Sequence, residues 1–256
     1  MTIELRHGRY QDVMHDVMCD HLITDPPFSE RTHSGQRHGR KDPRYTKDKS
    51  TILSAKGLPY EPWTAKEIIE CVHFWHERTQ GWMCIFTSHD LIPLYSKVMK
   101  RAGRYVFAPI PCIQMYRNVR LAGDGPANWT DYLVVSRPRT MRFWRALPGV
   151  YIGASHDPGE NALDRSKRAV PGGKPVWLMQ QIIEDYSDGS DLIADCCVGG
   201  GSTLIAAASL ERHAIGAEKT AKTYKKALHN ISKFKAVPLE LQETGHIQDL
   251  YTNASL

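Results

Sequence analysis

The stretch LITDPPF, residues 22–28, is a short apolar run that ends abruptly in an acid, two prolines and an aromatic ring. Leu22 and Ile23 suit a buried strand, and the prolines stop it because a proline nitrogen cannot donate to a sheet. The run therefore predicts a carboxylate, backbone carbonyls and an aromatic face at the end of a strand. A flat base with an exocyclic amine fits this set, because its ring can stack on Phe28 while its amine donates to Asp25 and to a prolyl carbonyl.

A second stretch, LIADCCVGGGST at residues 192–203, has the pattern of a strand, a glycine turn and the start of a helix. Glycines let a ligand approach the backbone closely, and a helix N-terminus offers free N–H groups. Glu218 ends the next predicted strand, nineteen positions after Gly199, where a carboxylate can accept both hydroxyls of a ribose. The turn would also suit a nicotinamide dehydrogenase, but that hypothesis gives residues 25–28 no function.

The rest of the chain alternates between predicted strands and helices, which indicates an α/β protein with one core and no second domain. Thr64 and Glu67 form a capping box, and Gly103 ends a later helix. We expect helices over residues 64–79, 91–101, 174–186 and 202–210, and a last one that follows Glu218 and runs to about Lys235. We expect seven strands, over residues 2–5, 22–24, 82–87, 105–115, 132–136, 192–196 and 214–217.

The number and spacing of the cysteines predict an intracellular protein without a cysteine metal site. They are Cys19, Cys71, Cys84, Cys112, Cys196 and Cys197. No pair has Cys-x-x-Cys spacing, so neither a zinc site nor a redox pair is indicated, and we expect them to be reduced and mostly buried. The first residues do not resemble a signal peptide, and no apolar run approaches the length of a membrane span. We therefore expect a cytoplasmic protein.

Two segments concentrate positive charge, although the formal net charge is only +5. Such clusters favour a polyanionic partner, and a solvated surface that aids solubility is an equally open interpretation of either one. The first cluster comprises Arg31, Arg37, Arg40, Lys41, Arg44, Lys47 and Lys49. The second comprises Arg137, Arg139, Arg142 and Arg145, with Phe143 and Trp144 beside them.

These motifs together resemble the amino-group DNA methyltransferases. Asp25, Pro26, Pro27 and Phe28 are similar to the family's catalytic motif Asp/Asn/Ser-Pro-Pro-Tyr/Phe. The glycine stretch is similar to its Asp-Pro-Phe-x-Gly-Ser-Gly-Thr-Thr motif, and residues 174–176 are similar to its Lys-Pro-x motif. The resemblance implies that S-adenosylmethionine is bound by Asp195, Cys197, Gly199, Gly201, Ser202, Thr203, Glu218, Lys174 and Pro175.

The motif order, with the catalytic motif first, resembles the permuted β class of this family. The resemblance implies a Rossmann-like class I methyltransferase fold with a seven-stranded mixed sheet flanked by helices. It also implies a catalytic half over about 1–136, a small inserted target-recognition region over about 137–173, a cofactor half over about 174–237 and a tail over 238–256. Relatives of this class are often dimers, which favours a homodimer.

The implied reaction is methylation of the N6 amine of an adenine flipped out of double-stranded DNA, in a solitary, restriction-associated or phage role. Phosphate contacts would come from Arg31, Arg37, Arg40, Lys41, Arg44, Arg137, Arg139 and Arg142. Cytosine N4 is the alternative acceptor, less favoured because those members more often begin the catalytic motif with Ser.

Two departures from the family pattern motivate a third hypothesis. Cys196-Cys197 stands where the family has Pro-Phe, which removes an aromatic wall of the cofactor pocket. Gly8-Arg9 stands where the family usually has Gly-Asp, whose acid contacts adenine. A non-catalytic DNA-binding protein that keeps the fold would tolerate both changes, and titration with S-adenosylmethionine separates it from an enzyme.

Overall fold

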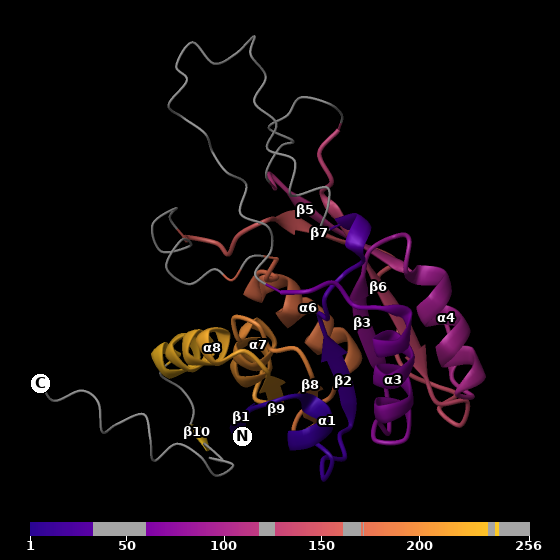
Figure 1. Cartoon of the computed structure of the whole chain (residues 1–256), viewed down its shortest axis with the longest axis horizontal. Helices are drawn as coiled ribbons and strands as arrows, with labels where there is room; N and C mark the ends of the chain where they lie inside the picture. The colour runs from indigo at the N-terminus through magenta and orange to yellow at the C-terminus, as the bar shows by residue number, and fades with distance from the viewer. Residues whose placement is uncertain (33–59, 118–125, 161–169, 171, 235–238, 241–256) are drawn as a thin grey trace, which may run out of the picture.

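A computed structural model describes residues 1–32, 60–117, 126–160, 170, 172–234 and 239–240 (Figure 1). Its strands form one ten-stranded sheet in the order β10-β1-β9-β8-β2-β3-β6-β5-β7, with β4 paired to β6. Among the described strands, β6 alone runs against the others. The strands are β1 (Ile3–His7), β2 (His21–Thr24), β3 (Met83–Thr87), β4 (Tyr105–Val106), β5 (Ile110–Met115), β6 (Thr130–Arg137), β7 (Tyr151–Ala154), β8 (Leu192–Asp195), β9 (His213–Glu218) and β10 (Leu239–Glu240).

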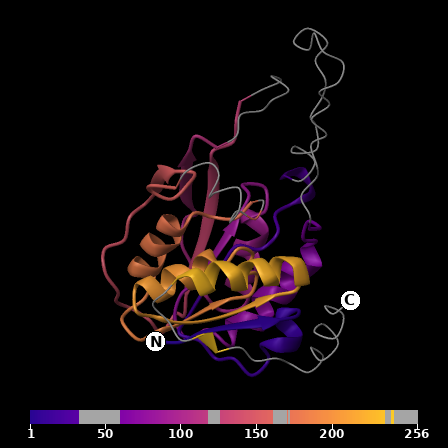
Figure 2. The same cartoon turned by 90° about the vertical axis from the view of Figure 1, so that its left-hand side faces the viewer.

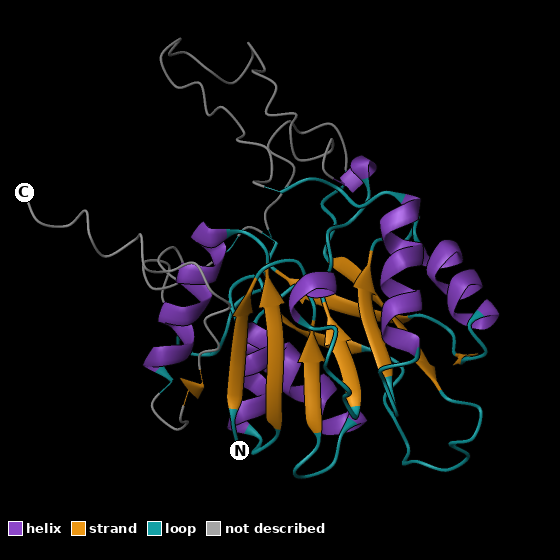
Figure 3. Cartoon of the chain, turned by 60° about the horizontal axis from the view of Figure 1, so that its bottom comes forward, coloured by secondary structure: helices purple, strands orange, loops and turns teal. Residues whose placement is uncertain are grey.

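Helices cover both faces of the sheet, as Figures 1 and 3 show. One face carries α1 (Tyr10–Val13), α3 (Ala65–His76) and α4 (Ile92–Arg101). The other carries α6 (Val176–Tyr186), α7 (Ser202–Ser209) and α8 (Ala221–Lys233), and α8 lies across the front of Figure 2. Successive residues of β2 point to opposite faces, so that Leu22 packs toward the first group and Ile23 toward the second.

The predicted helix signals are confirmed. The Thr64 Oγ1 atom accepts from the Glu67 backbone N–H at 3.3 Å, and a Glu67 carboxylate oxygen accepts from the Thr64 N–H at 2.8 Å. This is the capping box expected at the start of α3. Gly103 follows α4 with a φ of 79°, a left-handed conformation that favours glycine.

The expectation of seven strands is wrong, because the sheet has ten. The strand expected over residues 105–115 is divided into β4 and β5, and Pro109 lies between them without an N–H for the ladder. β7 lies within the expected recognition region, where the sequence is rich in glycine and proline but pairing with β5 still forms a strand. β10 adds two residues beyond β1.

The chain crosses in opposite directions from β2 and β8, which are neighbours in the middle of the sheet. From β8 the chain passes through α7 to β9 on one side, and from β2 it passes through α3 to β3 on the other. In open α/β sheets, ligands bind at such a switch point, beyond the carboxyl ends of the strands. Asp25 and the glycine turn both lie beyond those ends.

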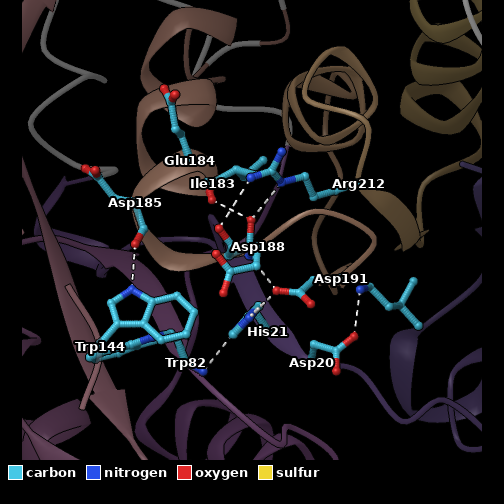
Figure 4. A network of polar contacts seen from close by, with 12 residues as sticks. Asp20, His21, Trp82, Trp144, Ile183, Glu184, Asp185, Asp188, Asp191 and Arg212 are labelled. Carbon is cyan, nitrogen blue, oxygen red and sulfur yellow. Dashed lines mark hydrogen bonds and ion pairs between the residues drawn. The ribbon is translucent and has the colours of Figure 1, made fainter.

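A polar network closes the opposite, amino-terminal edge of these two strands (Figure 4). The Trp82 backbone N–H donates to His21 Nδ1 at 2.9 Å, so the proton of the neutral ring is on Nε2. That Nε2 lies 3.0 Å from Asp191 Oδ2. Burial lowers the pKa of His21, although the Asp191 carboxylate opposes the shift. The neutral imidazole therefore joins the starts of β2, β3 and β8.

Candidate active site

The two sequence motifs meet side by side at the carboxyl edge of the sheet. Thr24, the last residue of β2, donates its hydroxyl hydrogen to Asp195 Oδ1 at 2.7 Å. Asp195 ends β8, and its Oδ1 also accepts from the Cys197 backbone N–H at 2.9 Å. These two strands are neighbours in the sheet, and their ends are joined by a buried hydrogen bond.

Burial and the neighbouring Cys196 raise the pKa of Asp195 to about 7. The opposing contributions are the hydrogen bonds that its carboxylate accepts from Thr203, Thr24 and the Cys197 N–H. Cys196 packs against Cys71, with 4.0 Å between their sulfur atoms. The cysteine that replaces the family's proline therefore faces α3.

The glycine turn contacts the carboxylate at the end of β9 through a backbone N–H group. Gly199 and Gly201 have φ values of 55° and 93°, which other residues rarely adopt. The Gly199 N–H donates to Glu218 Oε2 at 3.1 Å, and the Thr220 N–H donates to Glu218 Oε1 at 2.8 Å. The carboxylate at the end of β9 is thereby held against the turn.

Asp25 lies next to a buried cation. Its Oδ2 accepts from the Lys174 ammonium at 2.6 Å, while its Oδ1 is shielded from solvent and accepts no hydrogen bond within the described part of the chain. Burial raises the pKa of Asp25, and Lys174 opposes the shift. The Lys174 Nζ also lies 4.9 Å from the centre of the Phe28 ring.

A second carboxylate stands behind Lys174. Asp131, in β6, lies with its Oδ2 3.4 Å from the Lys174 Nζ. Arg117 donates to both oxygens of Asp131, at 2.9 and 2.7 Å, and the Gln114 amide donates to Oδ2 at 3.1 Å. Burial would raise the pKa of Asp131, but the charges of Lys174 and Arg117 outweigh it and hold that pKa below its usual value.

Sequence reasoning missed this second carboxylate and its partners. The predicted strand begins at Tyr132, one residue after Asp131, and an acid at the edge of an apolar strand was the available signal. Arg117 and Gln114 carry no such signal, because only the pairing of β5 with β6 brings them to Asp131. Phe86 was likewise missed, and its ring centre lies 5.0 Å from the Lys174 Nζ.

The remaining predicted cofactor residues gather around the start of α6 and α7. The Ser202 hydroxyl donates to the backbone carbonyl of Lys174 at 2.7 Å, which ties the two helices together. Pro175 is the N-cap of α6, and Thr203 is buried in the first turn of α7. Pro26 is buried and Pro27 is half-buried between Asp25 and Phe28.

The structure separates the predicted basic residues. Arg31 is exposed at the carboxyl edge, with its Nη1 3.1 Å from His89 Nε2 just beyond β3. Arg137 ends β6 beside the start of β3, at the amino-terminal edge, with its guanidinium over Tyr105. Arg139 and Arg142 follow it in the chain and are exposed. The residues of the two clusters that lie outside the described ranges are Arg37, Arg40, Lys41, Arg44, Lys47 and Lys49.

Among the residues that the structure describes, no three His, Cys, Asp or Glu side chains cluster closely enough to hold a metal ion. Within the same residues, no helix combines the length and the apolar character that crossing a membrane requires.

Several solved structures are similar to this chain. The M1.HpyAVI–SAM complex has a TM-score of 0.65 and 17% identity, over 90% of this chain and 98% of that one. TTHA0409, a putative DNA modification methylase from Thermus thermophilus complexed with S-adenosyl-L-methionine, has a TM-score of 0.55 and 16% identity, over 94% and 99%. The cytosine-N4-specific PvuII DNA methyltransferase has a TM-score of 0.62 and 10% identity, over 90% and 86%.

The likeness to these structures shows a Rossmann-like methyltransferase fold. A search among curated proteins found no match. The family model for N6/N4 DNA methylases matches residues 45–229, which include the glycine turn, Glu218 and Lys174 but not the 25–28 motif. The match spans well over half of the chain, and the chain therefore belongs to the N6/N4 DNA methylase family.

Proposed function

We propose that this DNA methyltransferase transfers the methyl group of S-adenosylmethionine to the N6 amine of an adenine flipped out of duplex DNA. One observation carries the proposal: the acceptor motif at Asp25 and the glycine turn lie on adjacent strand ends, joined by the Thr24–Asp195 hydrogen bond. A donor bound at the turn and a base bound at Asp25 would then share one site.

The residues at the turn fit the methyl donor. Gly199 and Gly201 place no side chain between the backbone and a ligand. Glu218 is only 9% exposed and accepts one backbone N–H on each oxygen, which leaves a lone pair on each for the hydroxyls of a ribose. When bound, S-adenosylmethionine supplies an electrophilic methyl group on a sulfonium.

Asp25 would act on the acceptor amine. An exocyclic amine is a weak nucleophile, because its lone pair is delocalised into the ring. Hydrogen bonds from the amine to Asp25 and to the Pro26 carbonyl favour a tetrahedral nitrogen, whose lone pair is available for attack. The site also holds the nitrogen in line with the methyl group. Such positioning lowers much of the activation barrier of a group transfer.

The exposed aromatic and basic residues at the carboxyl edge support DNA as the partner. Tyr116 and Trp129 lie at the end of β5 and before the start of β6, with 6.1 Å between their ring centres. They are 71% and 36% exposed. Stacking of a base on an aromatic ring contributes about 1–3 kcal/mol, and flipping a base costs about a few kcal/mol. Arg31 lies at the same edge.

The basic residues at the other edge have a smaller part in this proposal. Arg137 lies at the amino-terminal edge of the sheet, and Arg139 and Arg142 follow directly, so the DNA that reaches Asp25 would meet Arg31 first. The assignment of residues 137–173 to target recognition stays a prediction. So does the homodimer, which light scattering of the purified protein would test.

Digestion of methylated DNA to nucleosides tests the proposal. Purified protein is incubated with S-adenosylmethionine carrying a labelled methyl group and with duplex DNA of mixed sequence. N6-methyladenine is the expected product, and Asp25→Ala should yield none while still binding S-adenosylmethionine in calorimetry. Labelled N4-methylcytosine alone would establish the alternative acceptor, which the fold shared with a cytosine-N4-specific enzyme keeps open. No heat on titration with S-adenosylmethionine, with DNA binding intact, would establish the non-catalytic alternative.

A further inference from the structure

The Lys174 side chain is buried at the acceptor side of the site. Its side chain is 2% exposed, and its Nζ donates to Asp25 Oδ2 at 2.6 Å and to the Gly172 carbonyl at 3.3 Å. Its backbone carbonyl accepts a hydrogen bond from the Ser202 hydroxyl, at the start of the helix that follows the glycine turn. The side chain therefore points from the start of α6 toward Asp25.

A buried ammonium of this kind needs partners that do not move, because an unpaired charge in the interior is costly. Asp131 supplies one at 3.4 Å, and Asp131 is itself held by two hydrogen bonds from Arg117 and one from Gln114. The Lys174 Nζ also lies about equally far from the ring centres of Phe28 and Phe86, at 4.9 and 5.0 Å. These contacts fix the ammonium on several sides, independently of Asp25.

The two carboxylate oxygens of Asp25 differ in their hydrogen bonding. Oδ2 is bound to Lys174, whereas Oδ1 is buried and has no hydrogen-bond partner in the described part of the chain. A buried acceptor without a donor costs about 1–3 kcal/mol. An amine that donated to Oδ1 would recover that cost, and Phe28 is available to its ring, because the Lys174 Nζ that binds Oδ2 lies 4.9 Å from the Phe28 ring centre.

We propose that Lys174 is a positioning residue of the acceptor site, which holds Oδ2 of Asp25 so that Oδ1 receives the hydrogen bond of the target amine. The proposal rests on the proposed function and gives the lysine a role apart from the cofactor, to which the Lys-Pro-x resemblance assigns it. Asp131, with Arg117, anchors the ammonium.

Charge gives this arrangement a measurable signature. Burial raises the pKa of Asp25, and the ammonium of Lys174 opposes the rise, with Asp131 adding to it and Arg117 opposing it. Removal of Lys174 therefore raises that pKa further, so that Asp25 takes up a proton at a higher pH. Among the described residues, Tyr60, Tyr95 and Cys112 also interact with Asp25 electrostatically.

Three variants test the proposal: Lys174→Met, which removes the charge, Lys174→Arg, which keeps it, and Lys97→Met, a matched control at an exposed lysine of α4. We expect Lys174→Met to lower the single-turnover rate of methyl transfer by about 100-fold, as misplacement by about 1 Å does. We also expect the acidic limb of its pH–rate profile to move to higher pH. Its Kd for S-adenosylmethionine should stay within about twofold of wild type, and Lys174→Arg should restore the position of the limb.

A second readout does not depend on activity. The carboxyl carbon of Asp25 is followed by 13C NMR against pH, and its signal is assigned by its loss in Asp25→Asn. The midpoint should move to higher pH in Lys174→Met and stay in place in Lys97→Met. Weaker binding of S-adenosylmethionine by Lys174→Met, in proportion to the lost rate and with an unmoved midpoint, would overturn the proposal in favour of a cofactor role. A wild-type protein that transfers no methyl group would instead refute the proposed function, and the positioning role with it.

Discussion

Gly216 lies in β9, where the glycine turn packs against the sheet. A Cβ atom at this position would lie 2.2 Å from Val198 Cγ2, 3.0 Å from the Asp195 carbonyl oxygen and 3.1 Å from Leu204 Cδ1. Carbon atoms pack at about 3.5–4.0 Å, so Gly216→Ala requires Val198 to move by about 1.3 Å or more. The Asp195 carbonyl oxygen and Leu204 already lie close to the same Cβ atom and leave little room for it elsewhere. The substitution therefore displaces the turn itself.

Overpacking of this kind costs about 1–3 kcal/mol of folding free energy. For a domain of this size each kcal/mol lowers the Tm by about 2–4 °C, so we expect a decrease of roughly 2 to 12 °C. Because Val198 precedes Gly199 directly, we also expect the Kd for S-adenosylmethionine to rise about tenfold, which corresponds to about 1.4 kcal/mol.

Thermal unfolding and calorimetry of Gly216→Ala check both numbers. Gly189→Ala is the matched control, because a Cβ atom at Gly189 meets nothing within 4 Å. If the two variants have the same Tm and the same affinity, the packing of β9 does not set the position of the turn.

Three other predictions concern single side chains. Phe28→Ala should weaken capture of an extruded base, seen as a higher KM for DNA, with an unchanged Kd for S-adenosylmethionine. Because the pKa of Asp195 is raised to about 7, above its unfolded value, its contribution to stability is full below about pH 4 and is lost as pH rises through about 7. In urea titrations Asp195→Asn should therefore flatten the pH dependence between these limits. His21→Ala leaves the buried Trp82 N–H without its acceptor and should cost about 1–3 kcal/mol in the same assay, without an effect on S-adenosylmethionine binding, because the network lies at the far edge.

The acceptor motif and the glycine turn could be predicted because each is a local pattern in the sequence. The run of residues 22–28 contains a buried strand, a stop and a functional side chain within seven positions. The glycine turn is recognisable because Gly199 and Gly201 adopt left-handed φ values that favour glycine. The position of Glu218 could be predicted because only one helix and one strand separate it from the glycine turn.

The contact between Asp131 and Lys174 could not be predicted, because it depends on the pairing of strands that are far apart in the sequence. Asp131 reaches Lys174 only when β6 lies antiparallel between β3 and β5. The same reversal carries Arg137 away from Asp25, which is why a basic cluster that suggests DNA binding in the sequence lies at the far edge of the sheet. The direction of β6 is not encoded in its own residues.

The most direct test of the shared site is a comparison of Asp25→Asn with wild type in one preparation each, with circular dichroism as the control for folding. The single-turnover rate of methyl transfer to duplex DNA and the Kd for S-adenosylmethionine are measured together. We expect a rate lower by at least about 100-fold with a Kd within about twofold of wild type. An unchanged rate, or a rate and an affinity that fall by the same factor, would show that the two motifs do not form one site.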